Sequence, residues 1–208
     1  MSTASISEYL KSPKNVAGFR ELRGAVLASL GRTEPKSILV IPVSEHDDAA
    51  AVAAGTAASL AAPGYDVVLI DAQFTRPSAH HAFAKDQGPG LAEALTDGVD
   101  FERLSIQPVT PGLGLLAAGA NENLSIDLLA SLAFERLLDD LKQAGKWVVV
   151  VGDNPASEGG AATVAPLTDA TILVAAHGKS KSADAIAARN SLTDSGATVL
   201  GIVMTGDG

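Results

Sequence analysis

The sequence predicts a doubly wound α/β fold with a mainly parallel sheet and helices on both faces, and two observations carry this prediction. First, short runs rich in Val, Ile and Leu are apolar at successive positions, which is typical of strands covered on both faces. They span residues 37–43, 66–71, 147–152, 171–175 and 198–203. Second, segments of helical composition alternate with these runs, at 16–30, 47–62, 124–145 and 180–195. This rhythm is typical of strands joined by crossover helices.

The first predicted helix, 16–30, places most of its large apolar residues on one arc, with Arg20 at the edge of that arc and Arg23 inside it. Two explanations remain open for Arg23: its stem covers apolar surface while its head reaches water, or it contacts a partner. In the predicted helix 124–145, a broad apolar face is expected to enter the core, and Gly145 is a natural stop. That face comprises Ile126, Leu129, Leu132, Ala133, Leu137 and Leu141.

Composition favours one globular domain over residues 1–208, with residues 1–15 as a flexible N-terminal segment. The chain is 47% hydrophobic, and 15 basic against 24 acidic residues give a net charge of −9. The acidic balance argues against a nucleic-acid surface, which needs clustered Lys and Arg. With no cysteine, thiolate metal sites and cysteine nucleophiles are excluded. The polar N-terminus is not a secretory signal, and no apolar run is long enough to span a membrane.

Candidate functional residues follow the predicted strands, because the ligand crevice of an open parallel sheet lies beyond the carboxyl ends of its strands. Three such segments stand out: 44–51, 71–77 and 153–156. His80 and His81 lie just beyond the second. As neighbours on a helix they should point in different directions, so we expect solvent exposure rather than one shared metal.

Several of these segments, taken in order, resemble the kinase domain of the bacterial tyrosine autokinases of capsule and exopolysaccharide export, which are deviant-Walker P-loop ATPases. Phe19-Arg-Glu-Leu-Arg23 is similar to that family's N-terminal helix motif. Leu69-Ile-Asp-Ala72 with Arg76-Pro77 is similar to the second Walker motif, and Asp153 with Pro155 to the third aspartate motif. The resemblance implies a P-loop NTPase-like fold and a nucleotide site at the carboxyl edge of the sheet.

The phosphate loop itself departs from the family pattern P-G-E-G-K-S-T. His46 and Asp48 stand at the glycine positions, and Ala49 replaces the lysine. Ala50 and Ala51 remove the two hydroxyls, so the amide cradle, the cation and the magnesium ligand are all missing. Glu45, Asp47 and Asp48 would oppose a triphosphate, and Asp47 or Asp48 is expected to cap the following helix instead.

Other family positions are partly kept. Asp71 and Asp153 match two of the Walker aspartates, while Gln73 replaces another. Two carboxylates without phosphates make a weak magnesium site, so we expect capping at the strand ends and no metal. Phe19, Arg20 and Arg23 mark a candidate oligomer or partner interface, although Ala17 stands where the family's ring-forming motif has glutamate.

The resemblance therefore predicts a catalytically inactive relative, without catalytic residues or a cofactor, that does not bind ATP. It would serve as a scaffold or regulatory partner in polysaccharide assembly and export, in the cytoplasm beside a membrane co-polymerase or another export component, and as a possible homo-oligomer. Only Tyr9 and Tyr65 are present, so no tyrosine-rich substrate tail is expected. One alternative is an active ATP-dependent tyrosine kinase or ATPase that takes its cation from Lys36, Arg76 or Lys179. Another is a partition- or division-site-like regulator.

Overall fold

A computed structural model describes residues 12–74, 76–97, 103–120, 126–155 and 160–206. Its centre is a seven-stranded sheet in the order β3-β4-β2-β5-β1-β6-β7, in which only β3 runs antiparallel to its neighbour. The strands are β1 (Ser37–Pro42), β2 (Val67–Asp71), β3 (Gln107–Thr110), β4 (Leu113–Leu116), β5 (Trp147–Val151), β6 (Ala170–Ala176) and β7 (Val199–Thr205). The predicted fold class is confirmed, including the mainly parallel sheet.

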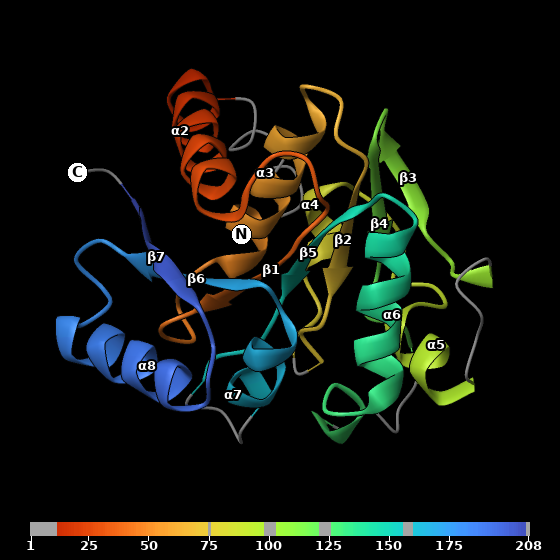
Figure 1. The fold of residues 1–208 in the computed structure, drawn as a ribbon. Coiled ribbons are helices and arrows are strands. Elements are labelled where there is room, and N and C mark those ends of the chain that lie inside the picture. Colours follow the sequence, from red (N-terminus) through yellow and green to blue (C-terminus); the bar gives the residue numbers. More distant parts are fainter. Residues whose placement is uncertain (1–11, 75, 98–102, 121–125, 156–159, 207–208) are drawn as a thin grey trace.

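Helices cover both faces of the sheet (Figure 1). One face carries α2 (Pro13–Leu30), α3 (Ala49–Ala61) and α4 (Ala79–Ala82). The other carries α5 (Leu91–Asp97), α6 (Leu132–Gln143), α7 (Gly160–Val164) and α8 (Ser182–Asp194), with short 3-10 turns η2 (Ile126–Leu128) and η3 (Ala165–Leu167). Ile38 and Val40 of β1 face the first layer, while Leu39 and Ile41 face the second. Because both faces are buried, every position in the strand is apolar or small, as the sequence predicted.

The N-terminal helix begins earlier than predicted. Residues 1–11 lie outside the described ranges, but Pro13 already occupies the first turn of α2, where its missing N–H costs nothing. The helix docks on α3 through Phe19, whose ring lies where Gly55 leaves room: a Cβ on Gly55 would come within 2.1 Å of it. Two hydrogen bonds fix this packing. Arg23 Nη1 donates to the Ser59 carbonyl at 2.7 Å, and Ser59 Oγ donates to the Phe19 carbonyl at 2.9 Å.

The predicted helix over 124–145 is wrong in its first part. The chain forms the η2 turn, and α6 starts only at Leu132, because the Ser131 hydroxyl caps its N-terminus by accepting from the Phe134 N–H. Leu132 is 68% exposed rather than in the core, while Phe134 is fully buried. At about 100° per residue, Leu132 lies about 180° from Leu141, so it is on the face opposite the buried side chains of Phe134, Leu137, Leu138 and Leu141.

In the part of the chain that the structure describes, no helix is both long and apolar enough to cross a lipid bilayer.

Candidate functional site

The candidate site lies at the carboxyl edge of the parallel strands, where the loops after β1, β2, β5 and β6 meet. These strands are neighbours in the sheet, so their following loops converge at one edge. The three segments that the sequence indicated all begin here. The loop after β6 is a fourth contributor.

Asp47 is the centre of the loop between β1 and α3. It is only 7% exposed, and its two carboxylate oxygens accept four hydrogen bonds. Oδ2 accepts from the Ser44 N–H at 2.8 Å and the Ser44 hydroxyl at 3.0 Å. Oδ1 accepts from the Ala176 N–H at 2.7 Å and the Ser180 hydroxyl at 2.6 Å. The Asp47 carboxylate thus joins the loop between β1 and α3 to the loop after β6. It is itself the hydrogen-bond acceptor in the loop between β1 and α3.

Asp48 caps the helix that follows. Its Oδ1 accepts from the Ala51 N–H at 3.0 Å, which satisfies one of the free amides at the start of α3. The predicted cap is therefore formed by Asp48, while Asp47 bonds elsewhere. Ala49, Ala50 and Ala51 are between 1% and 2% exposed, so their methyl groups belong to the core. His46 is exposed at the tip of the loop.

Asp71 is fully buried at the end of β2 and holds the next loop in place. Its carboxylate accepts from the N–H groups of Gln73 at 3.1 Å, Ser78 at 2.9 Å and Ala79 at 2.8 Å. Burial raises the pKa of Asp71 to about 6, aided by the nearby Asp153, although the three amide hydrogen bonds act in the opposite direction. Both oxygens face backbone amides, as the capping interpretation of this residue expects.

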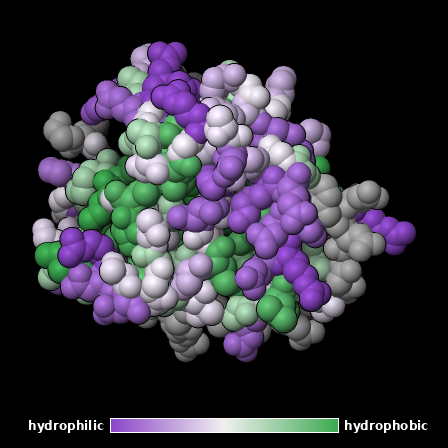
Figure 2. Space-filling model, in the orientation of Figure 1, coloured by the Kyte–Doolittle hydropathy of each residue, from purple (hydrophilic) through white to green (hydrophobic). Residues whose placement is uncertain are grey.

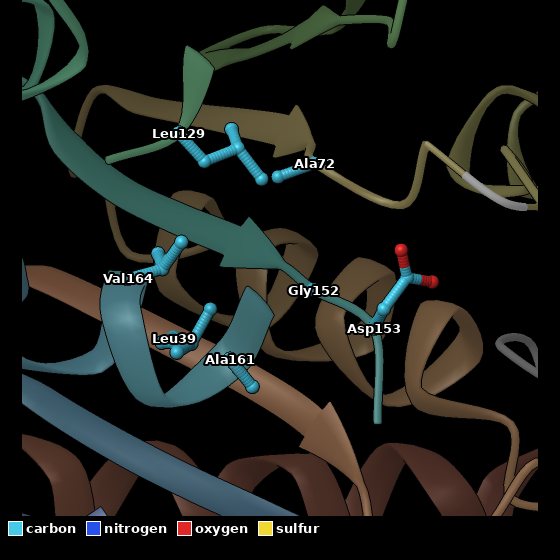
Figure 3. Close-up of a pocket in the computed structure, with 7 residues that line it drawn as sticks. All are labelled: Leu39, Ala72, Leu129, Gly152, Asp153, Ala161 and Val164. Carbon is cyan, nitrogen blue, oxygen red and sulfur yellow. The ribbon is translucent and has the colours of Figure 1, made fainter. Parts of the chain in front are cut away.

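Gln73 and Asp153 occupy the adjoining strand ends. The Gln73 side chain donates to the Gly152 carbonyl at 3.4 Å and accepts from the Ser78 hydroxyl at 2.8 Å, so it bridges the ends of β2 and β5. Asp153 follows Gly152 beside an apolar cavity of about 10 Å³, and its carboxylate points away from the apolar side chains (Figure 3). A cavity of this size holds at most one water molecule, so it is not a ligand site.

A larger cavity of about 650 Å³ lies beside the loop of Asp47, toward α8. Its lining carries balanced charge, with Lys179 and Lys181 against Glu45 and Asp184 in number. The remaining lining residues are Val43, Ser44, His46, Asn154, Pro155, Ala187, Ala188 and Ser191. This volume is in the range of small-molecule pockets, but its walls carry no surplus of positive charge for a polyanion.

The three cations that an atypical phosphate site would require are placed differently. Lys36 precedes β1, at the opposite end of a six-residue strand that is about 20 Å long, and pairs with Glu34. Arg76 forms an exposed ion pair with Glu45 at 3.7 Å. Lys179 borders the larger cavity. Of these three cations, only Lys179 and Arg76 lie at the carboxyl edge of the sheet, where the candidate site is.

Metal ligation has little support in the described ranges, where no three His, Asp or Glu side chains gather as a metal site would require. The expected solvent exposure is wrong for His80, which is only 7% exposed, and correct for His81, which is exposed. Their rings lie 3.9 Å apart. Burial lowers the pKa of His80, and the neighbouring His81 lowers it further.

The interface candidates on α2 divide into two groups. Phe19 is buried against α3 and Arg23 donates to the Ser59 carbonyl, so both support the docking of α2 within the molecule. Arg20 is exposed. The Arg23 side chain therefore contacts α3 within the molecule. A role of α2 in an oligomer or partner interface stays a prediction.

Sequence reasoning missed Ser44 and Ser180, whose hydroxyls hold Asp47. Ser44 lies two residues after the end of β1 and Ser180 four residues after the end of β6, and this position at the carboxyl edge is the feature that points to them. The pairing of Asp47 with Ala176 and Ser180 joins residues about 130 positions apart, and no local pattern reports such a contact.

Comparisons with known proteins agree with this fold. No protein-family model matches the chain. It is 23% identical over 186 residues to CapB of Staphylococcus aureus, described as a tyrosine-protein kinase, and covers 82% of that relative with 89% of its own length. It is 26% identical over 195 residues to tyrosine-protein kinase YwqD of Bacillus subtilis, where the match covers 92% of the chain and 81% of YwqD. It is 28% identical over 170 residues to the succinoglycan biosynthesis transport protein ExoP of Rhizobium meliloti, with 79% of the chain but only 21% of ExoP covered.

Solved structures share the fold. The kinase domain of Escherichia coli tyrosine kinase ETK superposes with a TM-score of 0.85 at 22% identity, over 92% of this chain and 75% of that one. The VpsO kinase domain superposes with a TM-score of 0.83 at 20% identity, and the match covers 97% of this chain and 98% of that one. The MinC:MinD cell division protein complex of Aquifex aeolicus superposes with a TM-score of 0.67 at 16% identity, and the match covers 81% of this chain and 68% of that one. The homologues are thus bacterial tyrosine-protein kinases, and the chain shares a P-loop NTPase-like fold with the tyrosine kinase domains and with MinD.

Proposed function

We propose that this chain, a homologue of bacterial tyrosine-protein kinases, is a pseudokinase that does not bind ATP and acts as a scaffold or regulatory partner in exopolysaccharide or capsule export. The observation that carries the proposal is the hydrogen bonding of Asp47. Its carboxylate takes four donors at the turn before α3, including the Ala176 N–H from another strand. These bonds fasten the loop before α3 to the loop after β6, and Asp48 already takes the Ala51 N–H, one of the amides at the start of α3 that a bound phosphate would need.

Electrostatics supports the same conclusion. A phosphate approaching this turn would meet Asp47 and Asp48, and each like-charge pair at 4 Å costs about 4 kcal/mol near a protein surface. Ala49, at the position of the family lysine, offers no compensating cation and is 1% exposed. Binding a triphosphate would require the loop to open and the Asp47 hydrogen bonds to break.

The polysaccharide context comes from relatives such as ExoP, whose name places it in succinoglycan biosynthesis and transport. By analogy, the partner of this chain is a membrane co-polymerase or another export component, which it would meet in the cytoplasm. The higher TM-scores of the two kinase domains favour this context over that of MinD.

The rival function is an active kinase or ATPase in which Lys179 or Arg76 supplies the cation. Thermal melting with millimolar MgATP or MgADP separates the two. A nucleotide at 100 times its dissociation constant adds about 2.7 kcal/mol of stability and raises the melting temperature by several degrees. We expect no shift, and a clear shift would establish the rival.

A restored variant provides the positive control for this assay. It combines His46→Gly, Asp48→Gly, Ala49→Lys, Ala50→Ser and Ala51→Thr, which returns the amide cradle, the cation and the hydroxyls. We expect it to gain a nucleotide-dependent shift that the parent chain lacks. If nucleotide shifts the melting temperature of neither protein, the loss of binding involves more than these five positions and includes the hydrogen bonds of Asp47 or Gln73.

A further inference from the structure

The two edges of the sheet differ in how they are protected. At one edge, β3 is only four residues long, contains Pro108 and has a register shift between Pro108 and Thr110. Short length, proline and irregularity are the usual means by which an edge strand avoids pairing with another chain. At the other edge, β7 has seven residues without a charge or a proline. Its one irregularity, at Leu200, leaves Gly201–Thr205 in regular register with β6.

The outer side of β7 offers both backbone groups and apolar side chains. The Thr205 carbonyl accepts from the His177 N–H and therefore points toward β6. Backbone groups alternate in direction along a strand, so those of Ile202 and Met204 point to the outer edge, beyond which the described residues place no further strand. Their side chains are 42% and 58% exposed.

Ile186 of α8, 55% exposed, is a third large apolar side chain in this part of the molecule. Figure 2 shows a hydrophobic area between α2 and α8, where β7 lies in Figure 1. Exposed apolar surface along an unprotected strand marks an interaction site.

Charge distribution indicates the occupant. Within 86–140, the described residues, which include β3, β4, α5 and most of α6, contain seven acidic and two basic residues. Residues 177–206, which form the β7 edge and α8, contain three basic and two acidic residues. The repulsion expected between two chains of net charge −9 is therefore weaker at β7 than over β3, β4, α5 and α6, which lie away from β7. Two copies can approach through β7 with little electrostatic penalty.

We propose that two copies of this chain associate through β7, pairing antiparallel about a two-fold axis near Val203. In this register Ile202 of each copy lies opposite Met204 of the other, as a hydrogen-bonded pair with apolar side chains in contact. The two seven-stranded sheets become continuous, and the same surface is used on both copies, as a two-fold interface requires. This inference goes beyond the proposed function and does not depend on nucleotide binding.

The test is the mass of the full chain in solution, measured by light scattering during size exclusion over micromolar concentrations. We expect twice 21.0 kDa for the parent chain. Ile202→Lys or Met204→Lys should return the mass to 21.0 kDa, because a lysine ammonium would be buried opposite an apolar side chain. Leu132→Lys is the matched control, since Leu132 is 68% exposed on α6, away from β7, and it should leave the dimer intact. Melting curves verify that each variant is folded.

Hydrogen exchange locates the interface independently. The Ile202 and Met204 amides should exchange more slowly as the concentration rises, and this protection should vanish in Ile202→Lys. A parent chain that stays at 21.0 kDa throughout, or a dimer that survives both lysine variants, overturns the proposal. A dimer lost only on Arg20→Glu, or only on deletion of residues 2–11, would assign the contact to α2 or to the N-terminal segment and would overturn it equally.

Discussion

Single residues at the carboxyl edge determine what the site can accept. Asp47 is bonded to Ser44 in its own loop and to Ala176 and Ser180 after β6, so two loops depend on one carboxylate. Asp48 makes one local bond at the start of α3. The two neighbouring aspartates therefore have different energetic roles although the sequence presents them alike.

Replacing Asp47 should cost much more stability than replacing Asp48. Asp47→Ala leaves the Ser44 and Ala176 amides and two hydroxyls without their charged acceptor, a loss of about 3 kcal/mol in the free energy of unfolding. Asp48→Ala removes one helix cap, worth about 1 kcal/mol. Urea denaturation of both variants measures the difference, and equal losses would show that Asp47 does not hold the two loops together.

Asp71 should make stability depend on pH. Its folded-state pKa of about 6 exceeds the ordinary value of 3.8, so the folded protein holds this proton more tightly than the unfolded chain. The stability it contributes is full below pH 3.8 and is lost as the pH rises through 6. In Asp71→Asn, the amide side chain resembles the protonated carboxylic acid and does not titrate. From pH 4 to pH 8 the parent chain should therefore lose up to about 3 kcal/mol relative to the variant.

The comparison with Asp71→Asn isolates this group from others that titrate nearby. Burial lowers the pKa of His80, which gives the opposite slope near pH 6.5, but that contribution is common to both proteins. A stability difference that stays constant across the pH range would contradict the assignment to Asp71.

At the scale of elements, the docking of α2 depends on a close approach between Phe19 and Gly55. Gly55→Ala places a methyl group where the Phe19 ring lies, so α2 must shift away from α3. We expect a loss of about 1–3 kcal/mol, as for other overpacked cores. Gly24→Ala on α2 is the matched control, since nothing lies within 4 Å of its Cβ position, and it should stabilise by about 0.5–1 kcal/mol. Thermal melting distinguishes the two, and equal effects would mean that this packing is not tight.

The sequence predicted β1, β2, β5, β6 and the edge strand β7, and in the first four, burial on both faces leaves a continuous apolar run, as in Val148–Val151. It did not reveal β3 and β4, whose four residues each are too few for a pattern and include Pro108 and Gly114. The cap by Asp48 was predictable since it spans three positions. The bonds of Asp47 to Ala176 and Ser180 were not, because only the tertiary fold brings these groups together.

At the scale of the whole molecule, the sheet separates two surfaces. Its carboxyl edge keeps the position of a nucleotide site, with the loop before α3 held by internal hydrogen bonds and a cavity of about 650 Å³ beside it. Its β7 edge is apolar and nearly neutral, while among the described residues the acidic surplus lies in 86–140, away from β7. Such a division suits a protein that works by contact with other chains, which is the role we propose for it.

The most direct test of this account is a nuclear magnetic resonance titration of the isotope-labelled full chain with MgADP. It follows the amides of Ser44 to Ala51 separately from those of Lys179 and Lys181. We predict that the amides around Asp47 keep their chemical shifts at millimolar nucleotide. Saturable shifts at residues 46–51 would show phosphates bound in this loop and would contradict the account.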